Sequence, residues 1–414
     1  MSKSSWPGFP RAFHRLAFST LFAQSAEQIG LAATSIVAVL VLGTGASGAA
    51  LLQATLTLPF LLFALPLGVL ADRRSRSRLM ATGEVVRFAS LSAIFVLLVF
   101  GKLTMPLLAL IGFLGAIGTV AYTVTAPSLV PSLVDRTRLL AANGRIELIR
   151  SLAYAGGPAI AGLLVGWTGA RWAFGVAIIF SATAAVALRG IPDRRQITRS
   201  SRRPLDDIRQ GIQFLWTNTL LRPILLTAVL FNLAWFCLQG IYVSYAISEL
   251  GHSSTQVGIV LGSYGAGMLL GALLAPIVTT ALPFGRVILI GPLSGATAAI
   301  VMLGTLWSPF IGIPMATYLL LGAGPILWTI STTTLRQAIT PDDLLGRVSA
   351  VLTMSTAGAR PLGAGIGALI AIAGGPQWCL VVACAGFLAQ AFVIASSETI
   401  RIDEQPSMVE SRVI

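Results

Sequence analysis

Charged side chains are scarce in this sequence. They make up 10% of the 414 residues, whereas a soluble domain carries about 25%, and 55% of the residues are hydrophobic. Carboxylates are the scarcest, with 15 Asp and Glu against 28 Lys and Arg. Apolar runs of about 20 residues, the length that crosses a bilayer, recur along the chain. The composition argues against a soluble globular protein and predicts an integral membrane protein.

Residues that carry metal or redox chemistry are also few. The sequence has two histidines, His14 and His252, and three cysteines, Cys237, Cys379 and Cys384, without metal-ligand spacing. No catalytic constellation is recognisable. The phosphate-binding patterns GxxxxGKS and GxxxxGKT are absent, so ATP hydrolysis by this chain is not indicated. We expect no enzymatic activity, no cofactor and no metal site.

Twelve apolar runs predict twelve transmembrane helices. The expected spans are 16–42, 49–71, 79–101, 105–127, 147–168, 171–190, 222–247, 255–281, 286–306, 310–334, 347–373 and 377–397. The expected fold class is therefore all-α and integral to the membrane. The first run is too long for a removable signal peptide and lacks a small-residue cleavage site, so we interpret it as a membrane helix.

The net charge of +13 is distributed asymmetrically between the expected loops. Most Lys and Arg fall in segments that a cytoplasmic N-terminus would place inside the cell, while Lys102 and Arg171 fall in outer segments. This asymmetry follows the positive-inside rule and predicts a multi-pass protein of the cell membrane with both termini in the cytoplasm. Because the basic residues mark topology, they predict contacts with membrane lipid and no nucleic-acid partner.

Residues 191–221 interrupt the succession of apolar runs and divide the chain into two halves, 1–190 and 222–414, the second with a short cytoplasmic tail. Within the interruption, the stretch from Pro204 to Trp216 places its apolar side chains on one helical face. Two interpretations stay open for this linker helix: it lies on the inner membrane surface beside anionic lipid, or it is solvated. The apolar positions are Leu205, Ile208, Ile212, Leu215 and Trp216.

The two halves match each other at a constant shift of 203 residues. The shift pairs Gly48 with Gly251, Gln53 with Gln256, Gly68 with Gly271, Gly101 with Gly304, Pro106 with Pro309, Pro158 with Pro361 and Gly162 with Gly365. Glycine and proline mark close helix contacts and bends. Their alignment in one register predicts two six-helix copies, arranged as parallel repeats about an axis along the membrane normal.

A basic loop follows the second expected span. Its residues Gly68, Leu70, Ala71, Asp72, Arg73 and Arg76 agree with the signature G-x-L-A-D-R-x-G-R-R of the major facilitator superfamily, which the segment resembles. The resemblance implies that Asp72 latches against the start of the eleventh helix and closes the cytoplasmic side, where the helix dipole favours a carboxylate. The alternative is a loop that sets topology and binds lipid. Ala275 and Pro276 replace the acid and the arginine in the second half, so one half would carry the latch.

Small residues and one proline recur in the fifth expected span. They are Gly144, Ala153, Gly157, Pro158, Ala161 and Gly162. The pattern resembles a signature of drug and proton antiporters of the same superfamily, although two of its glycines are alanines here. That resemblance implies export. The alternative is ordinary tight packing between the halves, because small residues let backbones approach and proline bends a helix.

Glu27 is the only acidic residue near the middle of an expected span, and Gln24 and Gln28 lie beside it on a polar stripe. A charged carboxylate is costly away from water, so we expect Glu27 to bind and release a proton or to recognise a cationic substrate. The alternative is a structural, hydrogen-bonded glutamate.

Two arginines also fall within apolar runs. Arg360, in the eleventh span, would either pair with Glu27 across a cavity or attract an anionic substrate. Arg87 follows Glu84 by three residues near the expected cytoplasmic end of its span. We interpret these two residues as an ion pair at a helix end.

The seventh and tenth expected spans combine aromatic and polar side chains, which suits a large amphipathic solute in a central cavity. The cavity candidates are Asn232, Trp235, Phe236, Gln239, Tyr318 and Trp328. Packing within the bundle is the alternative for each of them.

The chain as a whole resembles a major facilitator superfamily transporter, and within it the branch of enterobactin exporters and macrolide-efflux proteins. The loops that begin Val130-Pro131-Ser132 and Thr340-Pro341-Asp342 carry this finer resemblance. It implies a monomeric secondary exporter that exchanges protons for a small drug-like or siderophore-like molecule by alternating access. The fourth span lacks an arginine that proton-antiporter branches often carry, so coupling is expected from Glu27. Two alternatives stay open: an importer or facilitator on the same fold, and a membrane sensor or scaffold that transports nothing.

Overall fold

The computed structural model describes residues 9–134, 138–192 and 204–403, and the side chains of Asp72, Arg73, 140–141, 204–208, Asp342 and Asp343 lie outside the description. The described backbone consists of helices joined by short connections. The long helices are α1 (Arg11–Leu40), α2 (Ala46–Arg73), α3 (Arg76–Val99), α4 (Met105–Leu133), α5 (Leu139–Thr168), α6 (Ala170–Ala187), α8 (Leu221–Ser248), α9 (Ser254–Ala281), α10 (Phe284–Leu303), α11 (Gly312–Ile339), α12 (Asp342–Gly374) and α13 (Pro376–Ala395). A shorter helix, α7 (Pro204–Thr217), separates α6 from α8, and the 3-10 turns η2 (Gly304–Leu306) and η3 (Glu398–Arg401) follow α10 and α13.

Eleven of these helices, α2–α6 and α8–α13, are long and apolar enough to cross a bilayer by length and composition. The remaining long helix, α1, has 30 residues but carries a polar stripe around Glu27 that lowers its mean hydropathy. Its polar residues Gln24 and Gln28 are buried, because α1 packs against α5 and α6. A helix whose polar side faces other helices does not expose that side to lipid. We therefore count α1 as the twelfth span, and the prediction of an all-α membrane fold is confirmed.

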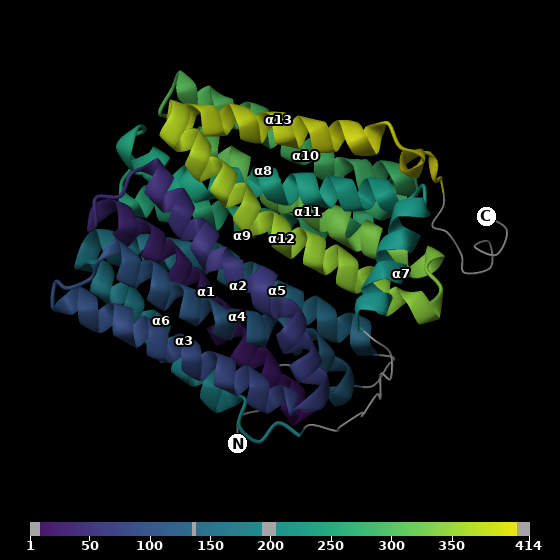
Figure 1. Ribbon diagram of the computed structural model, residues 1–414, viewed down its shortest axis with the longest axis horizontal. Helices are drawn as coiled ribbons and strands as arrows, with labels where there is room; N and C mark the ends of the chain where they lie inside the picture. The colour runs from purple at the N-terminus through teal and green to yellow at the C-terminus, as the bar shows by residue number, and fades with distance from the viewer. Residues whose placement is uncertain (1–8, 135–137, 193–203, 404–414) are drawn as a thin grey trace.

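The two sets of six helices pack by the same pattern (Figure 1). In the first set α1 lies on α5 and α6, α2 on α4, and α3 on α4 and α6. In the second set α8 lies on α12 and α13, α9 on α11, and α10 on α11 and α13. The sets meet mainly along α5 with α9 and α2 with α12, and α2 also contacts α8. This correspondence is the arrangement of parallel repeats; the domain limits 1–190 and 222–414 stay a prediction.

The contacts of individual glycines show that the shift of 203 residues is not constant. A Cβ on Gly157 of α5 would lie 2.5 Å from Cβ of Gln28 on α1. The corresponding close contact of α12 with α8 is made by Gly363, whose Cβ would lie 2.4 Å from the carbonyl oxygen of Leu233. Gly363 lies three residues beyond the position that the shift predicts. The gap-free register is therefore wrong in this part of the repeat.

Among the described residues, the hydrophobic core joins the two sets at one end of the molecule. We call the end with the connections 74–75, 282–283 and 340–341 the basic end, and the end with the connections 41–45, 100–104 and 249–253 the opposite end. One buried cluster at the opposite end includes residues of both sets, such as Val37, Tyr242 and Ala299. Toward the basic end the buried residues form two separate clusters, one within each set. The two sets are therefore packed together at the opposite end and apart at the basic end.

The predicted linker helix is present as α7, which lies crosswise at the basic end and packs on α12 and α8 (Figure 1). Leu215 is fully buried in the hydrophobic cluster of the second set, whereas Ile212 and Trp216 are exposed. Gly211 lies against the backbone of α12, where a Cβ would be 2.9 Å from the carbonyl oxygen of Arg347. The predicted face residues Leu205 and Ile208 lie outside the described side chains. Contact with the membrane surface stays a prediction.

Candidate functional site

A cavity of about 1340 Å³ lies between the two sets of helices. It extends from the middle of the bundle, at Glu27 and Gln239, to the basic end, at Glu147 and Arg336. Its walls come from α1, α2, α4 and α5 on one side and from α8–α13 on the other. Among the described residues, a core shared by both sets fills the opposite end, whereas the lining of the cavity extends to the basic end.

Close packing of α5 on α9 closes the opposite end. A Cβ on Gly162 would lie 2.5 Å from the carbonyl oxygen of Ser254 and 2.8 Å from Cα of Gly258, so neither backbone could approach as it does with a larger residue. The hydroxyl of Thr255 donates a hydrogen bond to the Gly162 carbonyl oxygen at 3.5 Å. Gly258 in turn lies against Pro158, since its Cβ would be 2.5 Å from the Pro158 carbonyl oxygen. Gly162 and Pro158 thus belong to the interface between the sets, whereas Gly157 contacts α1 of its own set.

Glu27 lines the cavity and belongs to a buried charge network. Its Oε2 lies 3.6 Å from a guanidinium nitrogen of Arg87 and accepts a hydrogen bond from the Gln24 amide at 3.3 Å. Arg87 also donates to Glu84 at 2.6 Å, and the Ser181 hydroxyl donates to the other Glu84 oxygen at 2.9 Å. Gln28 lines the cavity beside Glu27. One cation thus stands between two carboxylates, and of these Glu27 alone lines the cavity.

The predicted pair of Arg87 and Glu84 exists, but its predicted place at a helix end is wrong. Arg87 is the twelfth residue of the 24-residue helix α3, and both side chains are buried. Sequence reasoning placed the pair too close to the end because α3 begins at Arg76, three residues before the expected span. Arg87 also donates to the Thr119 hydroxyl of α4 at 2.9 Å. An arginine from the third helix thus lies against α4, in which the sequence offers none.

Arg360 lies in the middle of α12 and lines the cavity. Its guanidinium carbon is 5.1 Å from the ring centre of Phe60 on α2 and 5.7 Å from that of Phe236 on α8. Its buried Nε has no hydrogen-bond partner among the described residues. No ion pair with Glu27 is present, because in the described part of the chain Arg360 has no carboxylate oxygen within 4.0 Å. Of the two predicted roles, pairing with Glu27 is not observed in this conformation.

All six cavity candidates line the cavity. They are Asn232, Trp235, Phe236, Gln239, Tyr318 and Trp328. Trp235 makes an edge contact with Tyr318 at 5.4 Å between ring centres, and the Tyr318 hydroxyl donates to the Gln239 side-chain oxygen at 3.0 Å. The Asn232 amide donates to the Ala228 carbonyl oxygen on its own helix. These contacts combine aromatic surface with polar groups that are partly satisfied within the protein.

Sequence reasoning missed several residues of the cavity. Tyr264 of α9 stacks on Trp235 at 5.2 Å between ring centres, and Tyr154 of α5 follows at 6.0 Å from Tyr264. Glu147 and Arg150 form an ion pair at 2.9 Å on α5, toward the basic end. The two tyrosines are polar aromatic residues within the fifth and eighth apolar spans, the same signal that marks the cavity candidates of the seventh and tenth spans.

The predicted latch segment lies at the basic end of α2. A Cβ on Gly68 would meet nothing within 4 Å, so this glycine makes no close helix contact in this conformation. Arg76 donates to the Ser128 carbonyl oxygen of α4 at 3.0 Å. The side chains of Asp72 and Arg73 lie outside the described residues. The latch therefore stays a prediction.

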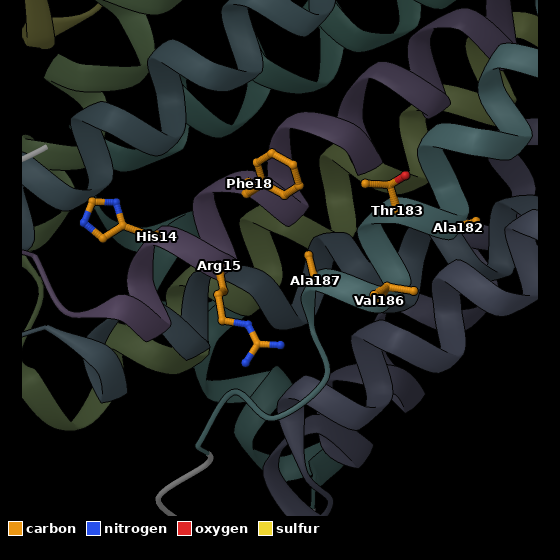
Figure 2. Close-up of a pocket in the computed structure, with 7 residues that line it drawn as sticks. All are labelled: His14, Arg15, Phe18, Ala182, Thr183, Val186 and Ala187. Atoms are coloured by element: carbon orange, nitrogen blue, oxygen red, sulfur yellow. The ribbon is translucent and has the colours of Figure 1, made fainter. Parts of the chain in front are cut away.

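A second cavity, of about 650 Å³, lies between α1 and α6 (Figure 2). Figure 2 shows His14, Arg15 and Phe18 on α1, and Ala182, Thr183, Val186 and Ala187 on α6. Both helices belong to one set, so this cavity lies away from the space between the sets and contacts none of the central residues. We assign the candidate site to the central cavity.

A family model described as transmembrane secretion effector matches residues 10–412. Among curated proteins, macrolide efflux protein A of Streptococcus pyogenes is 25% identical over 269 residues, which cover 63% of this chain and 66% of that protein, slightly under two thirds of its length. Enterobactin exporter EntS of Escherichia coli O1:K1 / APEC is 27% identical over 311 residues, 73% of each chain.

Solved structures share the fold at low sequence identity. A bacterial homologue of the iron transporter ferroportin in its inward-facing state is 17% identical, with a TM-score of 0.70 over 93% of this chain and 98% of that one. The nucleoside transporter NupG is 11% identical, with a TM-score of 0.73 over 94% and 99% of the two chains. Identities this low support the architecture alone.

Proposed function

Because this chain belongs to the transmembrane secretion effector family of major facilitator transporters, we propose that it exports a small amphipathic molecule, such as a drug or a siderophore, by alternating access. The observation that carries the proposal is the central cavity of about 1340 Å³, whose lining reaches the basic end while a core shared by both sets packs the opposite end. A binding site between two repeats that opens to one side at a time is the basis of such transport. The export and efflux proteins among its relatives support the outward direction.

The transporter acts as a proton antiporter through Glu27. This carboxylate lines the cavity and lies 3.6 Å from the buried Arg87. When the cavity faces one compartment, Glu27 exchanges its proton with that compartment. Arg87 stabilises the ionised form, since a carboxylate away from water requires a nearby cation. The Arg87 contact with α4 supports this role, because it brings a guanidinium from α3 to a helix that carries no arginine of its own.

The gate and the orientation complete the proposal. The basic end faces the cytoplasm of the cell, as the distribution of Lys and Arg indicates, so the cavity is open inward and both termini are cytoplasmic. Asp72 latches α2 to the start of α12 when the basic end closes. The protein resides in the cell membrane, is surrounded by lipid and acts as a monomer. The exchange of protons for cargo then drives net export.

Transport into everted membrane vesicles tests this function. A panel of small drugs and siderophores is offered outside the vesicles, with and without a proton uncoupler. We expect uphill accumulation of at least one compound and its loss with the uncoupler. Accumulation only in right-side-out vesicles would instead indicate an importer. No flux of any compound, together with indifference to changes at Asp72 and Glu27, would indicate a sensor or scaffold.

A further inference from the structure

The two walls of the central cavity carry different charges. Apart from Asp342 and Asp343, which begin α12 at the basic end, the helices α8–α13 contain no Asp or Glu. The acids that line the cavity are Glu27 on α1 and Glu147 on α5, so both belong to the first set of helices. The second set contributes Arg336 and Arg360. The carboxylates and the arginines of the second set therefore face each other across the cavity.

Each of the two cavity carboxylates already has a cation beside it. Glu27 lies 3.6 Å from Arg87, and Glu147 lies 2.9 Å from Arg150. Both cations belong to the same set of helices as their acids. Glu27 shares Arg87 with Glu84, and Glu147 pairs with Arg150, so among the described residues neither cavity carboxylate forms an ion pair with the arginines opposite.

Within the described part of the chain, Arg360 has no such counter-ion. It is the nineteenth residue of the 33-residue helix α12, so Asp343 lies about 25 Å away along the helix axis at 1.5 Å per residue. Arg336, by contrast, lies in the last turn of α11, where the helix dipole favours a cation. The rings of Phe60 and Phe236 hold the Arg360 guanidinium by cation–π contact, which stabilises the charge without neutralising it.

We propose that the cargo is an anionic amphipath, whose carboxylate, sulfonate or comparable group binds Arg360 and whose aromatic body lies against Trp235 and Tyr264. This inference rests on the proposed transport function and assigns the chemical class of its substrate. Arg360 is partly exposed and lines the cavity, and a guanidinium is suited to two-pronged binding of an oxyanion. The stacked rings of Trp235 and Tyr264, 5.2 Å apart at their centres, offer the apolar surface for the rest of the molecule.

An anionic cargo also fits the direction of transport. Because Arg87 lies near Glu27, the ionised carboxylate and the bound anion are close to different arginines, Arg87 in the first set of helices and Arg360 in the second. A membrane potential that is negative inside favours the exit of a negative charge. The potential would therefore add to the proton gradient in driving export.

The test measures binding apart from transport. The full-length protein in lipid nanodiscs is titrated calorimetrically with 1-pyrenebutyrate, 1-pyrenebutanol and 1-pyrenebutylamine, which share one ring system and differ in charge, and the heats from empty nanodiscs are subtracted. We expect the butyrate to bind at least about tenfold more tightly than the other two. Arg360→Gln should weaken its binding by about ten- to a hundredfold, as expected for a lost hydrogen bond to a charged group, and Arg360→Lys by less. Arg171→Gln, an exposed arginine on α6 away from the cavity, is the matched control and should change nothing.

Equal affinity for the three probes, a preference for the amine, no measurable binding, or butyrate binding that Arg360→Gln leaves intact would each overturn the anion assignment. The ranking of the three probes on the unmodified protein decides the matter even if Arg360→Gln does not fold. Transport measurements in vesicles distinguish a failure of the anion assignment from a failure of the proposed export function. Anion-selective binding without any flux would refute export and keep the anion site, whereas efflux of cations or neutral compounds alone would refute the anion site and keep export.

Discussion

Arg87 of α3 lies 3.6 Å from Glu27 of α1 while it holds Glu84, one turn back on its own helix, at 2.6 Å. The shorter contact assigns Arg87 primarily to Glu84, which Ser181 also binds. With both acids ionised, the three groups would carry one unneutralised negative charge away from water, a costly arrangement that a proton relieves. Glu27 is the acid that takes this proton in our proposal, because it lines the cavity.

Glu27→Gln should abolish proton-driven accumulation. With an imposed difference of about one pH unit, one proton exchanged per cargo molecule sustains about a tenfold accumulation. The amide cannot ionise, so the variant should only equilibrate its cargo, with no response to the gradient. The measurement is uptake into everted vesicles at several imposed gradients. Glu249→Gln, outside the spans, is the control, and full gradient-driven uptake by Glu27→Gln would refute the coupling role.

Arg87→Gln should destabilise the fold. It leaves Glu27 and Glu84 without their cation, and breaking a buried ion pair from one side costs about 3–5 kcal/mol. Thermal unfolding in detergent should show a clear loss, with a smaller one for Arg87→Lys. The double variant Glu84→Gln with Arg87→Gln should recover part of the stability, because it removes one of the stranded acids. A single and a double variant of equal stability would contradict the network described here.

Gly162→Ala should impair the closed packing at the opposite end. The new Cβ would lie 2.5 Å from the Ser254 carbonyl oxygen, so the helices α5 and α9 must move apart, at a cost of about 1–3 kcal/mol. Gly156→Ala is the matched control on the same helix, because a Cβ there meets nothing within 4 Å. Thermal unfolding and vesicle transport should both separate the two variants. If they behave alike, the close approach at Gly162 is not required.

Asp72→Asn should hold the cavity open at the basic end. Loss of a latch worth about 1 kcal/mol shifts the balance between open and closed forms by about fivefold. Leu273→Cys, in a background without the three native cysteines, places a reporter thiol on the cavity wall. A maleimide applied from the cytoplasmic side should label this thiol faster in the Asp72→Asn variant, with Asp72→Glu as the conservative comparison. Unchanged labelling would leave Asp72 as a topology marker.

The fold could be predicted from the sequence because its signals are local. Each apolar run has the length of a membrane-crossing helix, and the break at 191–221 marks the linker in which α7 lies. Among the described long helices, α1 alone is not apolar enough to count as a span by its composition, because it carries polar residues such as Glu27 and Gln28, which line the cavity. The composition of a span thus predicts that a helix is present, but predicts less well whether that helix faces lipid, other helices or a cavity.

The side-chain contacts of the site were harder to predict, because they depend on how the helices pack. The sequence identified Glu27, Arg360 and the aromatic candidates as cavity residues. It could not show that Arg87 would reach Glu27 and Thr119 on two other helices, since the rotation of each helix is set by tertiary contacts. It also placed the repeat in one gap-free register, which the Gly157 and Gly363 contacts contradict. Nothing in a single sequence reports such local slips between copies.

The position of α7 has a practical consequence for following the motion of this protein. Gly211 lies against the α12 backbone, Leu215 is buried in the core of the second set, and Gln210 binds Arg347. These attachments tie α7 to the second set of helices, although it follows the first set in the chain. A fluorophore on the exposed Gln213 would therefore move with α12, and paired with a second fluorophore on α3 it would report the opening and closing of the basic end as a change in energy transfer.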